Sequence, residues 1–372
     1  MVRYKFSKKQ DQEFTATLRS RVNNYFQENN LDRDANSTMI IKSICLLTWY
    51  LTPYFILILA GISNLYILMS LWVIMGLGKA FIGTSILHDS LHGSYSRSKR
   101  VNFWMGLSAM LIGVDSLIWK IQHNVIHHTY TNIEHTDEDI LPRFVFRFSN
   151  HQPKKWFHRF QHIYAPLFYC VPLLEWLTTK DFIKAFEYKQ MRLIKPGKEF
   201  IKELSAIIVR KIFYYIFFLA VPMLLIPIPA WMTLVMILVS SGVTGIMLAM
   251  IFQTAHVVPS AAFYEIEGDE VDHSWSAHQL LTTCNYGMND KVLSWLVGGL
   301  NFQVEHHLFP DICHVHYPAI APIVQQTTRE YGLPYFAVDS FSDAVKSHFY
   351  MLKQLGKHEE YEGQPSFYIA KA

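Results

Sequence analysis

Residues 65–92 read LYILMSLWVIMGLGKAFIGTSILHDSLH. The apolar part, Leu65–Ile86, is long enough to cross the apolar core of a bilayer, about 30 Å thick, as a helix. It leads directly to His88 and His92, and residues four apart share one face of a helix. This stretch therefore predicts a membrane-spanning helix that carries a pair of imidazoles to one membrane surface.

Three other apolar segments have the length of a span, and they complete two hairpins. The first hairpin turns at Gly61 and Asn64, and the second turns at Pro227 and Pro229. The other predicted spans are Ser43–Ala60, Ile212–Ile226 and Met232–Phe252. Half of all residues (51%) are hydrophobic and the net charge is only +3, which favours an integral membrane protein and argues against a nucleic-acid partner.

The distribution of basic residues predicts the orientation. Many lie between the two hairpins, among them Lys120, Lys154 and Lys155, whereas the hairpin turns contain no Lys or Arg. Cytosolic loops carry the excess of Lys and Arg in membrane proteins. We therefore expect a multi-pass protein whose termini and central segment are cytosolic.

Two shorter apolar segments, Val101–Trp119 and Tyr164–Trp176, contain Asp115 and Glu175 respectively. If Val101–Trp119 crossed the membrane, the histidines on its two sides would be separated by the bilayer. We interpret both segments as interfacial or re-entrant helices. Ordinary amphipathic helices of the cytosolic part are an equal alternative.

These observations predict one all-α integral membrane domain over residues 1–372. It has four transmembrane helices in two hairpins and a cytosolic helical cap. The expected parts are a cytosolic N-terminal segment (1–37), the first hairpin (38–86), cytosolic and interfacial helices (87–206), the second hairpin (207–256) and a cytosolic C-terminal part (257–372).

Two more histidine clusters accompany the first. One is His123-Asn124-Val125-Ile126-His127-His128, and the other is Gln303-Val304-Glu305-His306-His307. With His88 and His92 they supply seven imidazoles, more than one tetrahedral zinc can use. Two metals in a shared histidine cage is the simpler interpretation, and nitrogen ligands suit iron, copper or zinc.

His256 ends the fourth predicted span at the depth where His88 ends the second, and we expect it to be an additional ligand. Gln303 begins the third cluster and is expected to bind a metal, to hold a metal-bound water or to orient His307. Asp89, Asn124 and Asn132 are candidate acceptors for imidazole N–H groups, a contact that selects the metal-binding tautomer.

The remaining histidines have weaker signals. Hydrogen bonding behind the ligands is expected for His273, His278, His314 and His316. Solvated surface positions are expected for His135, His151, His158, His162, His348 and His358. The acidic run Asp137-Glu138-Asp139 is interpreted as a solvated loop.

The three clusters match the histidine boxes H-x-x-x-H, H-x-x-x-H-H and Q/H-x-x-H-H, and the chain resembles the membrane fatty acid desaturases. The similarity extends from about Trp72 to Pro318 and includes the flanking residues Phe302 and Leu308-Phe309-Pro310. The glutamine of the third box is similar to that of front-end and related acyl-lipid desaturases.

The resemblance implies two iron ions, dioxygen as co-substrate and an extra histidine outside the boxes, for which His256 is the candidate. It implies an enzyme that inserts a cis double bond into a fatty acyl chain held on CoA, a carrier protein or a lipid. No H-P-G-G haem motif is found. The electron donor is therefore expected to be separate, a ferredoxin or a cytochrome b5 with its reductase.

Other interpretations stay open at this point. A hydroxylase or ketolase would use the same histidine cage, and a metal transporter or sensor would need ligands near the bilayer midplane. The basic residues Lys154 and Lys155 could attract an acidic donor or contact lipid headgroups. Glycines in the second and fourth spans could shape an acyl tunnel or allow close helix packing. They are Gly76, Gly78, Gly83, Gly242 and Gly245.

Overall fold

A computed structural model describes residues 4–7, 11–141 and 145–361 of the chain. Its regular structure is almost entirely helical, as expected, with only two pairs of two-residue strands among the described residues. The chain divides into two compact units that each use separate stretches of sequence. Unit 1 comprises Met1–Asn36, Gln122–Ala165 and Met250–Ala372, and unit 2 comprises Ser37–Ile121 and Pro166–Ala249.

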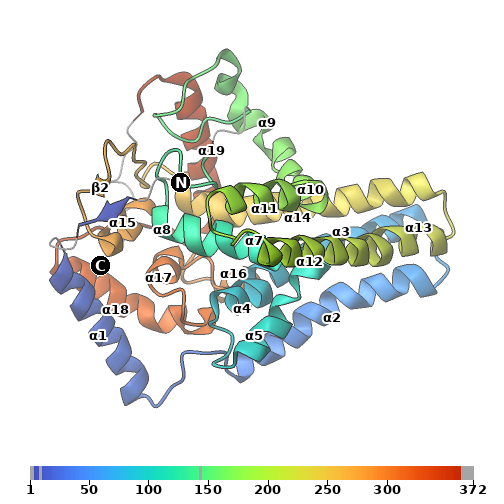
Figure 1. Cartoon of the computed structure of the whole chain (residues 1–372), viewed down its shortest axis with the longest axis horizontal. Helices are drawn as coiled ribbons and strands as arrows, with labels where there is room; N and C mark the ends of the chain where they lie inside the picture. Colours follow the sequence, from blue (N-terminus) through green and yellow to red (C-terminus); the bar gives the residue numbers. More distant parts are fainter. Residues whose placement is uncertain (1–3, 8–10, 142–144, 362–372) are drawn as a thin grey trace. The chain divides into compact units, whose positions relative to one another are not determined.

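Unit 2 contains the longest helices, which Figure 1 shows running alongside one another. Its elements are α2 (Ser37–Leu59), α3 (Leu65–Ile82), η1 (Gly83–Leu87), α4 (His88–His92), α5 (Lys99–Gly106), α6 (Ala109–Ile112), α7 (Ser116–Lys120), α10 (Val171–Thr178), α11 (Lys180–Gln190), α12 (Lys198–Tyr215), η4 (Ile216–Ala220), α13 (Val221–Leu225) and most of α14 (Ala230–His256).

Four helical stretches are long and apolar enough to cross a membrane. They are Ser37–Leu59, Leu65–His92, Lys198–Leu225 and Ala230–His256. The number agrees with the sequence prediction, but the third stretch begins well before the predicted Ile212. Basic residues made the sequence there look solvated. In the structure Lys211 is buried and its ammonium lies 2.7 Å from the carboxylate of Asp181.

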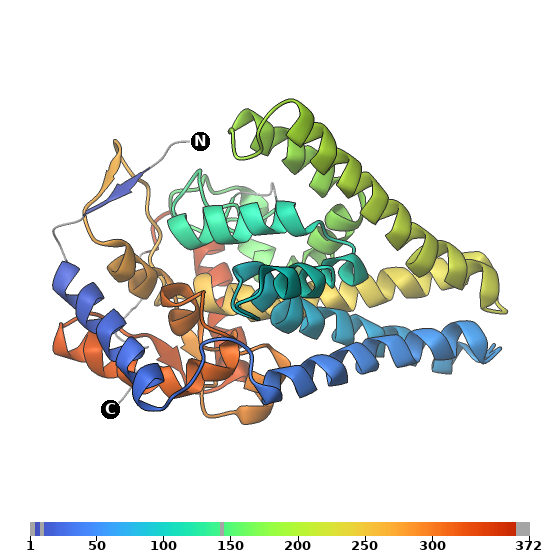
Figure 2. The same cartoon turned by 60° about the horizontal axis from the view of Figure 1, so that its bottom comes forward.

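Helix α3 begins at a side-chain cap and packs closely on its neighbours. Asn64 accepts hydrogen bonds from the backbone N–H groups of Tyr66 and Ile67, which satisfies donors that the first turn leaves open. Trp49 of α2 donates to the carbonyl of Ile74, and α2 and α3 lie side by side in Figures 1 and 2.

The span glycines serve close helix packing. A Cβ at Gly76 would lie 2.5 Å from the carbonyl oxygen of Ser240, and a Cβ at Gly245 would lie 2.6 Å from that of Tyr169. Both distances are too short for any larger residue. At these two positions the packing interpretation of the glycines therefore holds.

The segment Val101–Trp119, predicted to be interfacial or re-entrant with ordinary amphipathic helices as the alternative, is not one straight helix. The stretches Lys99–Ile112 and Ser116–Tyr130 meet at 105°. Gly113 ends α6 with a φ of 87°, a conformation that glycine adopts without strain. Asp115 then caps α7 through the N–H groups of Leu117 and Ile118.

Unit 1 is built from shorter helices around a common core. Its elements are β1 (Lys5–Phe6), α1 (Gln12–Glu28), η2 (Ile121–His127, beginning in unit 2), α8 (His128–Tyr130), η3 (Trp156–Phe160), α9 (Gln161–Phe168, ending in unit 2), the end of α14, β2 (Glu270–Val271), α15 (Trp275–Thr282), β3 (Asn285–Tyr286), α16 (Lys291–Leu296), α17 (Gln303–Leu308), η5 (His314–His316), α18 (Tyr317–Glu330), β4 (Ala337–Val338) and α19 (Phe341–Lys357).

The core of unit 1 supports α17, the helix of the third histidine cluster. Helix α1 buries an apolar stripe at every fourth residue, beginning with Phe14 and Leu18, against α17 and α18. Figure 2 shows α1 lying along α18, and Arg21 joins Glu330 at 2.6 Å. Burial of one such side chain contributes about 1.5–3 kcal/mol, so this packing holds α17 in place.

Candidate metal centre

The first histidine cluster belongs to unit 2. The single π-type turn η1 precedes α4, which carries His88 and His92 with ring centroids 4.6 Å apart. Both imidazoles make T-shaped contacts with the ring of Trp119, with centroids 5.9 and 6.0 Å apart. Asp89 Oδ1 lies 3.3 Å from His88 Nδ1, as expected of an acceptor. The two imidazoles therefore share one face, as their spacing predicts.

The second cluster lies in unit 1 on η2 and α8. The π-type turn η2 holds His123 and His127, and His128 follows at the start of α8. All three side chains are buried. Turns of this kind occur mostly as single insertions inside α-helices, and they are frequent at functional sites.

The third cluster lies on α17 of the same unit. Gln303, His306 and His307 are fully buried. Between them Glu305 accepts hydrogen bonds from Asn285 and Tyr335, both at 2.8 Å. Burial raises the pKa of Glu305 to about 7, while the hydrogen bonds from Tyr335 and Asn285 act in the opposite direction. These contacts anchor α17 beside its histidines.

The structure brings the second and third clusters together with His256, the last residue of α14. One ring nitrogen each of His127, His256 and His307 lies within 4.8 Å of the others, and the same holds for His128, His306 and His307. His128 Nε2 lies 3.2 Å from His123 Nε2 and 2.9 Å from His306 Nε2. Six imidazoles from three separate stretches of sequence therefore converge within unit 1.

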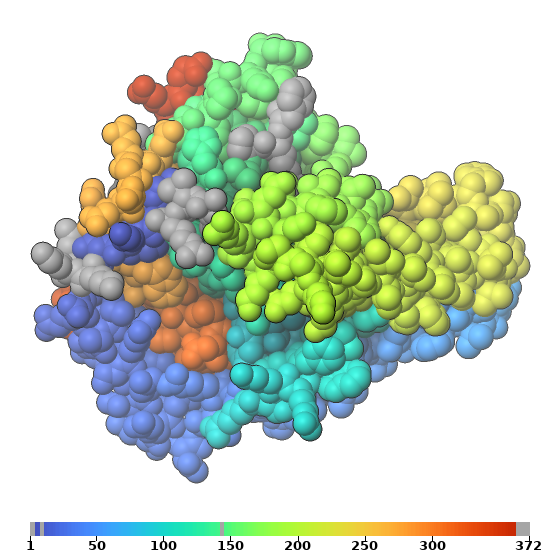
Figure 3. Space-filling model, in the orientation of Figure 1, coloured from blue at the N-terminus to red at the C-terminus, as the bar shows by residue number. Residues whose placement is uncertain are grey.

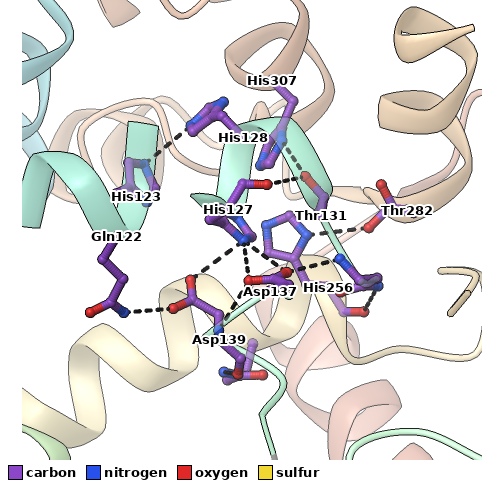
Figure 4. A network of polar contacts seen from close by, with 12 residues as sticks. Gln122, His123, His127, His128, Thr131, Asp137, Asp139, His256, Thr282 and His307 are labelled. Atoms are coloured by element: carbon purple, nitrogen blue, oxygen red, sulfur yellow. Dashed lines mark hydrogen bonds and ion pairs between the residues drawn. The ribbon is translucent and has the colours of Figure 1, made fainter. Parts of the chain in front are cut away.

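Oxygen atoms behind the histidines determine which ring nitrogen faces inward. His127 Nδ1 donates to Asp137, and Figure 4 shows this contact beside His256. His256 Nδ1 lies 3.2 Å from the carbonyl oxygen of Thr282, and His307 Nδ1 lies 2.8 Å from Gln279 Oε1. Because these oxygens only accept, Nδ1 carries the proton and Nε2 keeps its lone pair, the form that binds a metal.

None of these three acceptors was predicted from the sequence. Gln279 and Thr282 come from α15, and Asp137 belongs to the acidic run that was interpreted as a solvated loop. That interpretation was wrong for Asp137 and Glu138, whose side chains are buried. The backbone N–H groups of Asn132 and Asp139 donate to Asp137, which explains how a carboxylate is held there. Its position nine residues after His128 was an available signal.

The other predicted polar neighbours have different positions. The amide of Asn132 donates to the backbone carbonyls of His256 and Ala262 and does not accept from an imidazole. Asn124 is half-buried. Gln303 lies beside His256, and neither atom of its buried amide makes a hydrogen bond of good geometry to a described residue.

Four further histidines had been expected behind the ligands. His273 Nε2 lies 2.9 Å from His278 Nδ1, and His278 in turn donates to the carbonyl of Thr131, so this pair contacts the segment of the second cluster. His316 donates to the carbonyl of Asp34, away from the cluster. His314 is buried.

The expected surface histidines are only partly at the surface. His158 and His348 are buried, so the prediction was wrong for these two. His348 donates to the carbonyl of Val257, and His158 accepts from the N–H group of Lys155. Both lie at helix contacts that the sequence alone does not display. His135 and His358 are exposed, as predicted.

Comparison with known proteins agrees with the site. The model of the fatty acid desaturase family matches residues 64–339. The chain is 36% identical over 353 residues to an acyl-lipid (8-3)-desaturase of Physcomitrium patens, covering 94% of this chain and 73% of the relative. It is 30% identical over 351 residues to an sn-1 linoleoyl-lipid 6-desaturase of Arthrospira platensis, covering 93% and 94% of the two chains. The resemblance of the histidine boxes is thus confirmed, and the chain belongs to the fatty acid desaturase family, whose members are oxidoreductases that desaturate fatty acyl chains.

Proposed function

We propose that this chain inserts a cis double bond into an acyl chain carried on a membrane lipid, using dioxygen and two electrons at a di-iron centre. The observation that carries the proposal is the convergence of six imidazoles around His128, whose Nε2 lies 2.9 Å from that of His306. A hydroxylase or ketolase would use the same cage, and desaturation is favoured over these and over metal transport because the relatives are named desaturases.

The residues present fit a metal centre. With their Nδ1 protons directed to oxygens, His127, His256 and His307 turn lone pairs toward one another in a buried space. Nε2 of His256 has no hydrogen-bond partner among the described residues. Buried nitrogen lone pairs that face each other are unfavourable, and a bound cation would remove this cost.

The complete ligand set in this proposal has eight histidines. Six are the converging residues of unit 1, and the first cluster on α4 supplies the other two. The ligands are His88, His92, His123, His127, His128, His256, His306 and His307. Eight imidazoles suit two metal ions. Gln303 is assigned to a metal-bound water or to the metal itself, because its buried amide lies beside His256 and has no other described partner.

Iron would supply the oxidant needed to remove hydrogen from an unactivated methylene, a reaction for which no side chain is strong enough. The protein's own contribution is orientation. Asp137 and Gln279 fix the rings of His127 and His307, and the carboxylate of Asp137 offsets positive charge at the site. The burial of all these groups excludes water from the reacting chain.

The proposed placement in the membrane follows the four apolar helices. The stretches Ser37–Leu59 and Leu65–His92 form one transmembrane hairpin, and Lys198–Leu225 and Ala230–His256 form the second. Residues 1–372 act as one desaturase domain with a cytosolic helical cap. Both termini and the metal centre face the cytosol, where basic residues are concentrated.

Substrate and donor are proposed from the relatives and the sequence. Relatives of nearly the same length are named for lipid-linked acyl chains, such as the linoleoyl-lipid 6-desaturase of Synechocystis, of which this chain covers 98%. We therefore favour a lipid-linked acyl chain over one held on CoA or a carrier protein. A separate ferredoxin, or cytochrome b5 with its reductase, provides electrons.

Expression in a host of defined fatty acid composition tests the function. New cis double bonds should appear in the host's lipid fraction and should be absent from a host that carries the His306→Ala variant. Mass analysis locates each bond and its carrier. A product heavier by one oxygen would identify a hydroxylase instead, and new bonds only in the acyl-CoA pool would refute the lipid-linked substrate.

A further inference from the structure

One helical segment, which begins in unit 1 and ends at Phe168 in unit 2, exposes a row of apolar side chains. The segment consists of η3 followed directly by α9. Phe160 at the end of the 3-10 helix η3 and Ile163 and Leu167 of α9 are spaced by three and four residues, which places them on one face. Trp156 begins η3 and adds a fourth large apolar side chain to the segment. Their exposed fractions are 75%, 43%, 67% and 71%. Isolated exposed apolar residues are common, but a row of four large ones marks an interaction surface.

The opposite face of the same segment is fixed to the protein. His158, Gln161 and Ala165 are buried. Gln161 donates to the carbonyls of Leu352 and Arg147. A Cβ at Gly356 of α19 would lie 2.1 Å from the carbonyl oxygen of His158, so α19 and η3 are in direct backbone contact. Figure 3 shows the green segment on the outside of the molecule near the red end of α19. The apolar row is therefore presented on a rigid support.

Basic side chains border the apolar row. Arg159 lies on the same segment, with its guanidinium 4.6 Å from the ring centre of Phe160. From α19, Lys353 and Lys357 are exposed and lie close enough to His162 to lower its pKa, together with the larger effect of burial. Lys154 at the start of the segment pairs with Glu359 at 2.8 Å and is thereby neutralised.

We propose that this surface, formed by Trp156, Phe160, Ile163 and Leu167 with Arg159, Lys353 and Lys357 at its border, inserts into the headgroup region of an anionic bilayer. A Trp at the end of an apolar row is typical of the membrane interface. An Arg over an aromatic ring is typical too, because the aromatic ring enters the acyl boundary while the guanidinium stays in water. Cations beside the row attract anionic headgroups. This surface would give the segment its own contact with the membrane, separate from the proposed spans.

A docking site for an acidic protein is the competing occupant, because the same cations would attract it. The apolar row argues for lipid. Docking surfaces of soluble electron donors are transient and small, whereas four large apolar side chains would remain exposed to water between encounters. A bilayer covers them permanently.

The test measures depth with spin labels on the full chain in vesicles of phosphatidylcholine and phosphatidylglycerol. The native cysteines are replaced, and single cysteines are placed at Ile163 and, as a matched control, at Lys346, an exposed residue on α19. Dissolved oxygen should relax the label at residue 163 several-fold more strongly than a water-soluble nickel complex, and residue 346 should show the reverse order. Equal nickel access at both positions would overturn the proposal.

Two further arms complete the experiment. The double variant Lys353→Gln/Lys357→Gln should bind anionic vesicles less deeply. The relaxation of the label at residue 163 by oxygen, divided by its relaxation by nickel, should therefore fall toward the value found in pure phosphatidylcholine. An unchanged ratio would refute the role of these lysines. If residue 163 is accessible to nickel until an acidic donor protein is added, the surface is a protein-docking site. None of these measurements depends on desaturase activity, so the outcome is independent of the proposed function.

Discussion

The carboxylate of Asp137 lies with both oxygens 3.1 Å from Nδ1 of His127. This contact joins the second histidine cluster to a residue ten positions later. Both side chains are buried, so the interaction is not weakened by solvent. It fixes the ring tautomer and places negative charge behind a proposed ligand.

Replacement of Asp137 by Asn should therefore reduce metal binding without removing a ligand. An amide carries no charge and can turn its NH2 group toward His127. We expect a roughly 10- to 100-fold loss of iron affinity or activity, as for other groups that orient metal ligands. Metal titration of the purified variant measures this. Asp139→Asn is the graded control, because Asp139 lies 3.5 Å from His127 and is partly exposed; an equal loss in both variants would contradict the role given to Asp137.

Purified protein should contain about two irons per chain, because eight imidazoles are too many for one ion. Replacing His256 with Ala should lower the iron content and abolish activity, since a nitrogen that faces the cluster is lost. Elemental analysis for iron and zinc provides the measurement. One zinc and no iron in an active preparation would contradict the di-iron proposal. His256→Ala with normal iron and turnover would remove only this residue from the ligand set.

The sequence predicted the parts of the fold that depend on hydropathy and on local spacing. Four spans and three histidine clusters follow from runs of apolar residues and from helical periodicity. Contacts between distant segments could not be predicted in this way. Asp137 looked solvated because three acids in a row normally are, and no motif around His348 distinguished it from a surface histidine. In the structure His348 donates to Val257, 91 positions earlier, and Asp137 accepts from the backbone N–H groups of Asn132 and Asp139 in a local turn.

His348 should now make stability depend on pH. Burial lowers the pKa of its imidazole to about 4, with the hydrogen bond to Val257 acting in the opposite direction. In the unfolded chain the value is about 6.5. The unfolded state therefore takes up a proton first as the pH falls, and stability present above pH 6.5 is lost progressively toward pH 4. The loss amounts to about 3 kcal/mol at most.

The variant His348→Asn tests this dependence, because its amide N–H can still donate to the carbonyl of Val257 but does not titrate. Thermal unfolding in detergent should show a smaller decrease between pH 7 and pH 5 for this variant than for the natural chain. His358→Asn, at an exposed position, is the control. Parallel pH profiles of the natural chain and the His348→Asn variant would show that His348 does not contribute.

Turnover is expected to need a separate protein as electron donor. The sequence shows no haem, flavin or iron–sulfur motif, so the purified chain should not turn over with NADH or NADPH alone. Activity should appear when ferredoxin, or cytochrome b5, is added with its reductase. The measurement is product formed per chain with each component omitted in turn. Turnover with a nicotinamide cofactor and no added protein would refute a separate donor.

The last prediction concerns topology, on which the ligand set depends. His88 and His92 precede the bent segment Lys99–Tyr130, and His123 lies within it. The two clusters can join one metal centre only if this segment does not carry the chain across the membrane. Taken alone, Asp115 argues against crossing because an inserted charge is costly. In the structure its carboxylate caps α7 and pairs with Arg210, so that cost is offset within the protein. The 105° bend after Gly113 divides the segment into two arms, which fits a re-entrant loop as well as a broken span, so the location of residues on its two sides decides.

Single cysteines in a cysteine-free background locate these positions directly. Ser98→Cys, Asn124→Cys and Asn150→Cys should all react with an impermeant thiol reagent added to the cytosolic side. Asn64→Cys, which caps α3 in the turn of the first proposed hairpin, should react only from the opposite side. Inverted and right-side-out vesicles provide the two conditions. If residues 98 and 124 report opposite faces, the first cluster cannot share a metal with the second. The ligand set would then shrink to the six histidines that the structure brings together.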